Sequence, residues 1–212
     1  MATNTKAVRS LRKNLFLSNY QKLILIGSIL GDGSLSGQYT KEKQETNYRL
    51  QVIHSEKQKE YLWWKYEIFR KWCLSPSKYT EKTHSWRFRT ISHSELTEFH
   101  KIFYDKNGKK IIPRNICSFL NESLTLAVWF MDDGTKGPSN GYTLNSQSFS
   151  KFENQTLKNC LESNFGILVS LHNDRSKSRL YIKTHSTSRF EYLIRPFIVP
   201  SMVYKFICPR RD

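Results

Sequence analysis

The chain has 212 residues, of which 38% are hydrophobic and 14% aromatic, a composition typical of a globular protein with a buried core. It carries 34 Lys and Arg against 18 Asp and Glu, and the formal net charge of +16 indicates a polyanionic partner, either nucleic acid or an anionic membrane surface. Membrane insertion is disfavoured because the longest apolar run, Leu23 to Gly31, is half the length of a spanning helix. The four cysteines form no C-x-x-C pair and the six histidines are scattered, so we expect free thiols, a reducing compartment and no zinc site.

Residues 1–20 form a basic segment, because the first acidic residue of the chain is Asp32. Two interpretations fit such a segment: an organelle transit peptide, or a basic arm that lies along phosphates. We favour the arm, because Leu11, Leu15, Phe16 and Leu17 provide apolar side chains that would pack on the fold.

The remaining elements follow the same order twice. The apolar run 23–31 predicts a helix, and polar residues 34–40 and alternating residues 47–54 predict strands. The next predicted elements are a helix over 56–72, a strand over 86–91 and a helix over 94–104. After a turn at 105–108, the second apolar run ends at Gly134. After it we predict a loop over 135–140, a strand over 142–147, a helix over 152–165, a hairpin formed by 167–172 and 180–185, and a helix over 188–198.

Both apolar runs end in Asp-Gly, at Asp32-Gly33 and Asp133-Gly134, with the two aspartates 101 residues apart. Glycine at these points predicts helix ends with left-handed caps. A carboxylate at a helix C-terminus is disfavoured by about 0.3–1 kcal/mol, so its repetition suggests that a bound cation offsets the charge. The expected ligands of a divalent metal are the side chains of Asp32 and Asp133 and the carbonyl oxygens of Gly31 and Asp132. The alternative interpretation of each Asp-Gly pair is an ordinary cap or turn.

Polar side chains face away from the apolar side of the expected strands. Arg, Gln, Asn and Lys are the side chains that read base edges in a DNA major groove, whereas an antiparallel sheet also exposes a polar face simply to water. The scarcity of acidic residues on these strands favours DNA. The candidate DNA contacts are Ser36, Gln38, Arg49, Gln51, Arg87, Arg89, Asn145, Gln147, Lys183 and His185.

These residues resemble the LAGLIDADG homing endonuclease family, in its single-chain, two-motif, intron-encoded form. The resemblance extends from about Gln21 to Lys205 and is strongest over residues 129–134, Trp-Phe-Met-Asp-Asp-Gly. It implies an α+β fold of two pseudo-symmetric αββαββα units, packed through central motif helices, with antiparallel sheets forming a DNA-binding saddle. The implied division is a basic arm at 1–20, a first half at 21–118 and a second half at 119–212.

The resemblance also implies the chemistry. Asp32 and Asp133 match the family's metal-binding aspartates, and Lys110 and Lys205 match its basic helper residues. The implied metal is Mg²⁺, with Mn²⁺ as a substitute and Ca²⁺ binding without supporting cleavage. Val128 and Asp132 stand where the family's motif usually has small residues, so we expect looser, less symmetric packing of the second motif helix.

We therefore predict a monomeric, sequence-specific endonuclease that makes a double-strand break with 3′ overhangs at a long intron-insertion site in double-stranded DNA. An organelle is the expected location. One alternative is an intron RNA maturase on the same fold, with intron RNA as its partner. A second is a non-catalytic DNA-binding protein, and a third, a membrane-surface protein, lacks a suitable basic amphipathic helix.

Overall fold

The computed structural model describes residues 5–37, 47–174 and 177–208, which form two compact units. Unit 1 comprises Met1–Lys22 and Asp32–Ile102, and unit 2 comprises Leu23–Gly31 and Phe103–Asp212. The first motif helix therefore belongs mainly to unit 2, and the chain passes into unit 1 at the peptide bond between Gly31 and Asp32. The division into repeat halves at residues 118 and 119 concerns the sequence repeat and stays a prediction.

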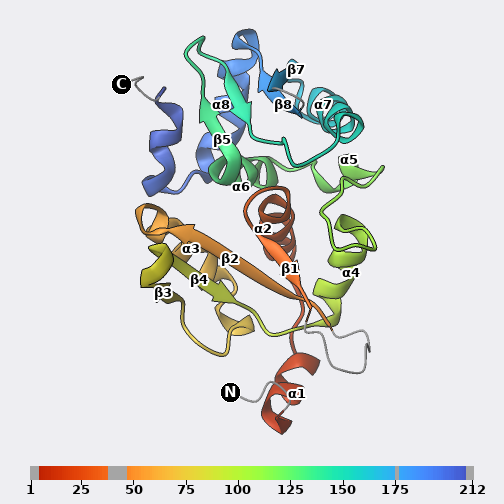
Figure 1. The fold of residues 1–212 in the computed structure, drawn as a ribbon, viewed down its shortest axis with the longest axis vertical. Coiled ribbons are helices and arrows are strands. Elements are labelled where there is room, and N and C mark those ends of the chain that lie inside the picture. Colours follow the sequence, from red (N-terminus) through yellow and green to blue (C-terminus); the bar gives the residue numbers. More distant parts are fainter. Residues whose placement is uncertain (1–4, 38–46, 175–176, 209–212) are drawn as a thin grey trace. The chain divides into compact units, whose positions relative to one another are not determined.

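Unit 1 is built on a four-stranded antiparallel sheet with the strand order β1-β2-β4-β3 (Figure 1). Helix α3 packs on β2 and β4, and the Tyr66 ring meets the Phe88 ring edge-on with centroids 5.9 Å apart. Leu50 and Val52 of β2 and Leu62 of α3 are buried as well. The elements are α1 (Lys6–Lys13), β1 (Ser34–Ser36), β2 (Arg49–Ser55), α3 (Lys59–Ile68), β3 (Lys78–Thr80), β4 (Ser85–Arg89) and α4 (Ser94–Phe103).

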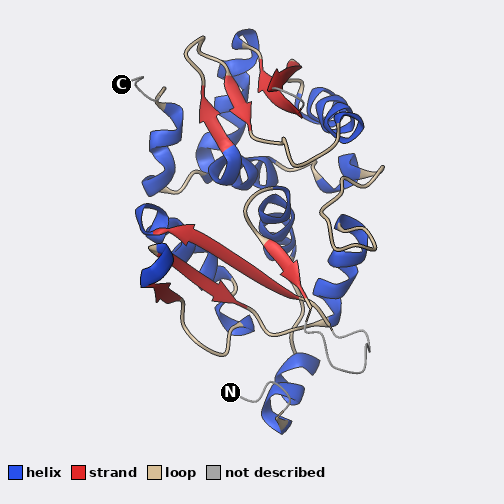
Figure 2. Ribbon diagram, viewed as in Figure 1, coloured by secondary structure: helices blue, strands red, loops and turns tan. Residues whose placement is uncertain are grey.

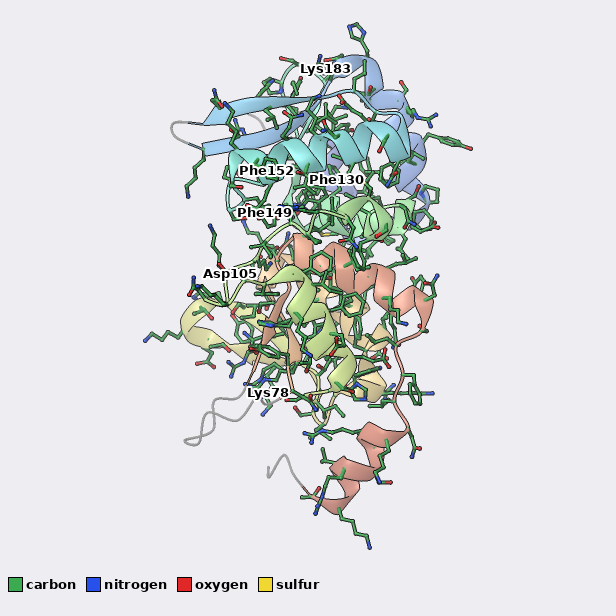
Figure 3. All side chains as sticks on the ribbon, turned by 90° about the vertical axis from the view of Figure 1, so that its right-hand side faces the viewer. Lys78, Asp105, Phe130, Phe149, Phe152 and Lys183 are labelled. Atoms are coloured by element: carbon green, nitrogen blue, oxygen red, sulfur yellow. The ribbon has the colours of Figure 1, made fainter. Side chains whose placement is uncertain are left out.

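Unit 2 contains a second antiparallel sheet with the order β5-β6-β8-β7, and helix α7 packs on β7 and β8 (Figure 2). Phe130, labelled in Figure 3, lies 5.3 to 5.4 Å between ring centroids from Tyr142, Phe190 and Phe206. The elements are α2 (Asn19–Leu30), α5 (Ile116–Phe119), α6 (Ser123–Asp133), β5 (Gly134–Lys136), β6 (Tyr142–Leu144), α7 (Lys151–Phe165), β7 (Val169–Asp174), β8 (Lys177–Ile182), α8 (Thr187–Ile194) and a 3-10 helix, Pro200–Phe206.

The predicted fold class is confirmed, since the order αββαββα occurs twice, first from α2 to α4 and again from α6 to α8. Two predictions at the ends of the motif helices were wrong. Strand β5 begins directly after α6, in place of the expected loop, and positive φ among the described glycines is confined to Gly108 and Gly166. Gly134 is extended, with φ −84° and ψ 152°, because the chain enters β5 and the Phe130 ring occupies the space a Cβ would need.

The described part of the N-terminal segment is docked on unit 1. Helix α1 begins at a cap in which the Thr5 hydroxyl accepts the Val8 N–H at 3.3 Å, and its end is held by a 3.0 Å hydrogen bond between His93 Nε2 and the Arg12 carbonyl. Leu15 and Leu17 are buried as expected, whereas Phe16 is 75% exposed and does not pack. The interpretation of this segment as a basic arm along phosphates stays a prediction.

As expected, the cysteines Cys73, Cys117, Cys160 and Cys208, all within the described residues, form no disulfide. Cys160 is buried, and the other three are partly exposed. Among the described residues, no helix has the length and apolar character that crossing a membrane requires.

Candidate active site and nucleic-acid interface

Helix α2 ends where a lysine reaches its last turn. Lys110 Nζ donates a 2.6 Å hydrogen bond to the main-chain oxygen of Gly31, the residue directly before Asp32. Main-chain pairing positions this lysine, because Lys110 forms a bridge with Tyr104 and the Ile111 N–H donates to the Phe103 carbonyl at 2.8 Å. An ammonium group at this point offsets the partial negative charge of the helix C-terminus.

Helix α6 ends in the same way. Lys205 Nζ donates a 2.9 Å hydrogen bond to the main-chain oxygen of Asp132, the residue directly before Asp133. Asn145 adds two further donors, because its main-chain N–H and its Nδ2 reach the Asp133 carbonyl at 3.0 and 2.9 Å. Lys205 lies in the 3-10 helix Pro200–Phe206, which packs beside β5.

The two lysines thus occupy equivalent positions, each on the carbonyl that precedes a motif aspartate. This equivalence supports their pairing, although they stand on opposite sides of Pro113 and Pro200 in the sequence. The same carbonyls were expected to be metal ligands. A carbonyl oxygen has two lone pairs, so a lysine hydrogen bond leaves one available, and their metal binding stays a prediction.

Asp32 is the first residue of the second segment of unit 1, and 43% of its side chain is exposed, so its carboxylate is accessible to a ligand. His54 lies beside it, with Nδ1 3.6 Å from Asp32 Oδ2. His54 is buried on β2 and packs on Tyr61, with ring centroids 5.0 Å apart. Sequence reasoning missed this histidine. Its signal was the alternation of β2, because residues 50, 52 and 54 share the buried face.

The motif helices pack closely within unit 2, which corrects the expectation of loose packing. A Cβ on Gly27 would lie 2.7 Å from Val128 Cβ and 2.6 Å from the Thr125 carbonyl, and a Cβ on Gly31 would lie 2.7 Å from Asp132 Oδ2. The Thr125 hydroxyl also donates to the Leu23 carbonyl at 3.2 Å. The larger residues of α6 therefore fit because glycines on α2 leave room for them.

The open face of the unit 1 sheet carries the predicted polar residues. Cross-strand partners share a face, and the register pairs Ser36 with Arg49, Gln51 with Arg89, and Arg87 with both Ile53 and Lys78. Arg87 and Arg89 are exposed, and Arg49 and Gln51 are partly exposed. This face is cationic, as DNA binding requires. Gln38, also predicted, lies outside the described residues.

On the unit 2 sheet, the predicted polar strand residues do not lie on strands. Strand β6 ends at Leu144, because Asn145 turns back to bind the Asp133 carbonyl, and Gln147 follows in the next turn. Strand β8 ends at Ile182. Lys183, labelled in Figure 3, directly follows it, and His185 lies in a 3-10 turn closed by the Ser186 N–H on the Lys183 carbonyl.

Other residues form the open face of this sheet. The register places Thr143 opposite Thr135 and Tyr181, and His172 opposite Arg179. The Tyr181 and His172 rings stack at 4.3 Å between centroids. Sequence reasoning missed these residues because it extended β6 and β8 too far toward the C-terminus and placed no strand at β5.

A profile of the LAGLIDADG DNA endonuclease family matches residues 22–190. The chain is 30% identical over 221 residues to the probable intron-encoded endonuclease 1 of Wickerhamomyces canadensis, covering 98% of this chain and 93% of that protein. It is 29% identical over 212 residues to DNA endonuclease I-ChuI of Chlamydomonas applanata, covering 89% and 95%. The structure of the homing endonuclease I-WcaI bound to its DNA recognition sequence superposes with a TM-score of 0.84 and 27% identity, covering 99% of this chain and 96% of that one.

The chain also matches mycobacterial RecA proteins, but spans half of their length or less, 47% for that of Mycolicibacterium flavescens and 28% for that of Mycobacterium leprae. The match to the family profile covers most of the chain, and the chain therefore belongs to the LAGLIDADG DNA endonuclease family. Taken together, the comparisons support a DNA endonuclease.

Proposed function

We propose that this chain is a Mg²⁺-dependent, sequence-specific endonuclease that makes a double-strand break with 3′ overhangs at a long, asymmetric site in DNA. The observation that carries the proposal is the repeated arrangement at the motif helix ends, where Lys110 and Lys205 each bind the carbonyl that precedes an aspartate. Family membership gives this arrangement its nuclease context.

The residues present suit a hard divalent cation. Asp32 and Asp133 offer carboxylate oxygens, which Mg²⁺ and Mn²⁺ prefer, and Asp32 is accessible. Such an ion would make bound water a nucleophile at neutral pH and stabilise the leaving oxygen of a phosphodiester. His54 would hold the Asp32 carboxylate in one orientation, and Lys110 and Lys205 would add positive charge next to the scissile phosphates.

An asymmetric target fits the inequality of the two halves. Gly27 of α2 and Gly31, which directly follows α2, correspond to Val128 and Asp132 of α6, so the two motif aspartates have different surroundings. The open face of sheet β1-β2-β4-β3 carries Arg49, Arg87 and Arg89, whereas that of sheet β5-β6-β8-β7 carries Arg179 together with threonines and the stacked Tyr181 and His172. One chain that contains both repeats would act as a monomer, and the intron-encoded relatives favour an organelle as its location.

The test is a cleavage selection from a randomised DNA library with Mg²⁺, followed by sequencing of the cut ends. We expect one long site with 3′ overhangs. Asp32→Asn and Asp133→Asn should each abolish double-strand cleavage while DNA binding persists. Glu98→Gln is the control, because it removes an exposed carboxylate from α4. Full cleavage by the double aspartate variant would refute the proposed metal ligands.

A further inference from the structure

A basic cavity of about 230 Å³ lies in unit 1, between the end of α1 and the strand sheet. Four of its lining residues are cations contributed by four elements, α1, β2, β3 and β4, and the described lining residues include no acid. The lining residues are Arg12, Arg49, Leu74, Ser75, Lys78, Arg89, Thr90, Ile91 and Ser92.

The fold holds these cations in place. Arg49 and Arg89 lie on the same face of neighbouring strands, since Gln51 pairs with Arg89 and lies two residues along β2 from Arg49. Arg12 lies in the docked helix α1, and its main-chain carbonyl is hydrogen-bonded to His93. The His93 ring packs edge-on against Trp72, with ring centroids 4.9 Å apart. Strand pairing and the docking of α1 therefore hold the backbones of these residues in place, while the side chains of Lys78 and Arg89 reach the surface.

The positive charge in the cavity has little compensation. Among the described residues, no carboxylate forms an ion pair with Arg49, Lys78 or Arg89, and Arg49 Nε is buried without a hydrogen-bond partner. Burial, and then the charge of Arg89, lower the pKa of Arg49. Collecting like charges in this way is unfavourable, and an anion with several acceptor oxygens would relieve it.

We propose that this cavity binds one phosphate group, and that its occupant is a backbone phosphate of the DNA. Guanidinium groups match phosphate bidentately, and the Ser75 and Ser92 hydroxyls provide neutral donors at the rim. The identification of DNA as the source of the phosphate rests on the proposed function. The same side chains would also bind inorganic phosphate. Arg49 and Arg89 would then set the position of the DNA and would not read its bases.

The first experiment uses inorganic phosphate as the probe, titrated into the whole chain without DNA and followed by calorimetry. Arg12→Gln and Arg89→Gln should each weaken phosphate binding about tenfold, the effect of losing a charged hydrogen bond. Lys13→Gln and Lys82→Gln are the controls, because both are exposed lysines of unit 1 that lie outside the lining and are not among the candidate DNA contacts, and both should bind phosphate like the wild type. Melting curves confirm that each variant folds, and Arg12→Lys tests whether the guanidinium fork is needed beyond its charge.

The second experiment scans the selected DNA site with single neutral methylphosphonate linkages in Ca²⁺. One linkage should weaken binding by the wild type but cause no further loss in Arg12→Gln or Arg89→Gln. If the cavity binds inorganic phosphate but no methylphosphonate linkage shows this behaviour, the cavity is a site for the free anion and not for the DNA backbone. The proposal is overturned if pocket and control variants bind inorganic phosphate equally, or if Arg89→Gln only relaxes the preference at one base pair. If the wild-type protein cuts no DNA, the proposed function is refuted, but the titration with inorganic phosphate still tests whether the cavity binds phosphate.

Discussion

The packing of the two motif helices makes a sharp prediction for Gly27→Ala. A Cβ at this position would meet the Thr125 carbonyl oxygen at 2.6 Å and the Val128 Cβ and Cγ1 at 2.7 and 2.9 Å. In an exposed helix the same substitution would stabilise the protein by about 1 kcal/mol through helix propensity. Overpacking of a tight core costs about 1–3 kcal/mol, and a backbone oxygen cannot rotate away from the new methyl group.

The clash with a backbone oxygen that cannot move away places the cost toward the upper end of this range, so after the propensity gain we expect a net loss of up to about 2 kcal/mol. For a protein of this size, that corresponds to a fall of up to about 8 °C in the melting temperature. The measurement is thermal unfolding followed by circular dichroism. Gly137→Ala is the control, because its nearest neighbour would be the Gly141 carbonyl at 3.5 Å, an ordinary contact, and its melting temperature should stay close to that of the wild type.

A double-mutant cycle separates the two neighbours of Gly27. Val128→Ala removes the clash with Cγ1 but leaves those with the Cβ of residue 128 and with the Thr125 carbonyl, so the double variant should recover only part of the loss, with a coupling energy of about 0.5–3 kcal/mol. A Gly27→Ala variant that melts at or above the wild-type temperature, with no coupling to position 128, would refute the described helix contact.

Three further predictions concern the two lysines, the partly exposed Glu153 and the buried Asn154. Lys110→Met and Lys205→Met should each slow cleavage roughly 100-fold in one strand, so that nicked plasmid accumulates, and equal slowing of both strands would contradict the pairing. Burial alone would raise the pKa of Glu153, but its hydrogen bonds, chiefly those from Ser150, outweigh burial and lower the pKa below 4.5. This stabilisation is present above pH 4.5 and lost as the pH falls through the lowered pKa, so Glu153→Gln should melt earlier at pH 7, with a difference from the wild type that shrinks in acid. Asn154→Ala should cost about 1–3 kcal/mol for each buried group left unpaired, measured by urea unfolding, because Nδ2 of Asn154 donates to the carbonyls of residues 146, 149, 150 and 178 at 3.1–3.3 Å.

Local patterns in the sequence were sufficient for the repeat and for most elements. Helical spacing in the two apolar runs and alternation over residues 47–54 follow from how side chains leave a helix or a strand, and both are visible within a few residues. The same patterns predicted the buried Leu50 and Val52 and the polar face with Arg87 and Arg89. Strand ends were less certain, as Asn145 shows, since a hydrogen bond to residue 133 decides where β6 stops.

By itself, the sequence determined that the chain has two like halves and is strongly basic. It also determined that each half contains an apolar helix followed by an aspartate. Only the tertiary structure decided what surrounds those helix ends. Lys110 and Gly31 are 79 residues apart in the chain, and Lys205 and Asp132 are 73 apart, so no local pattern links them. The fit of Val128 against Gly27 and the approach of His54 to Asp32 likewise depend on the distance between packed backbones, which spacing along a sequence does not specify.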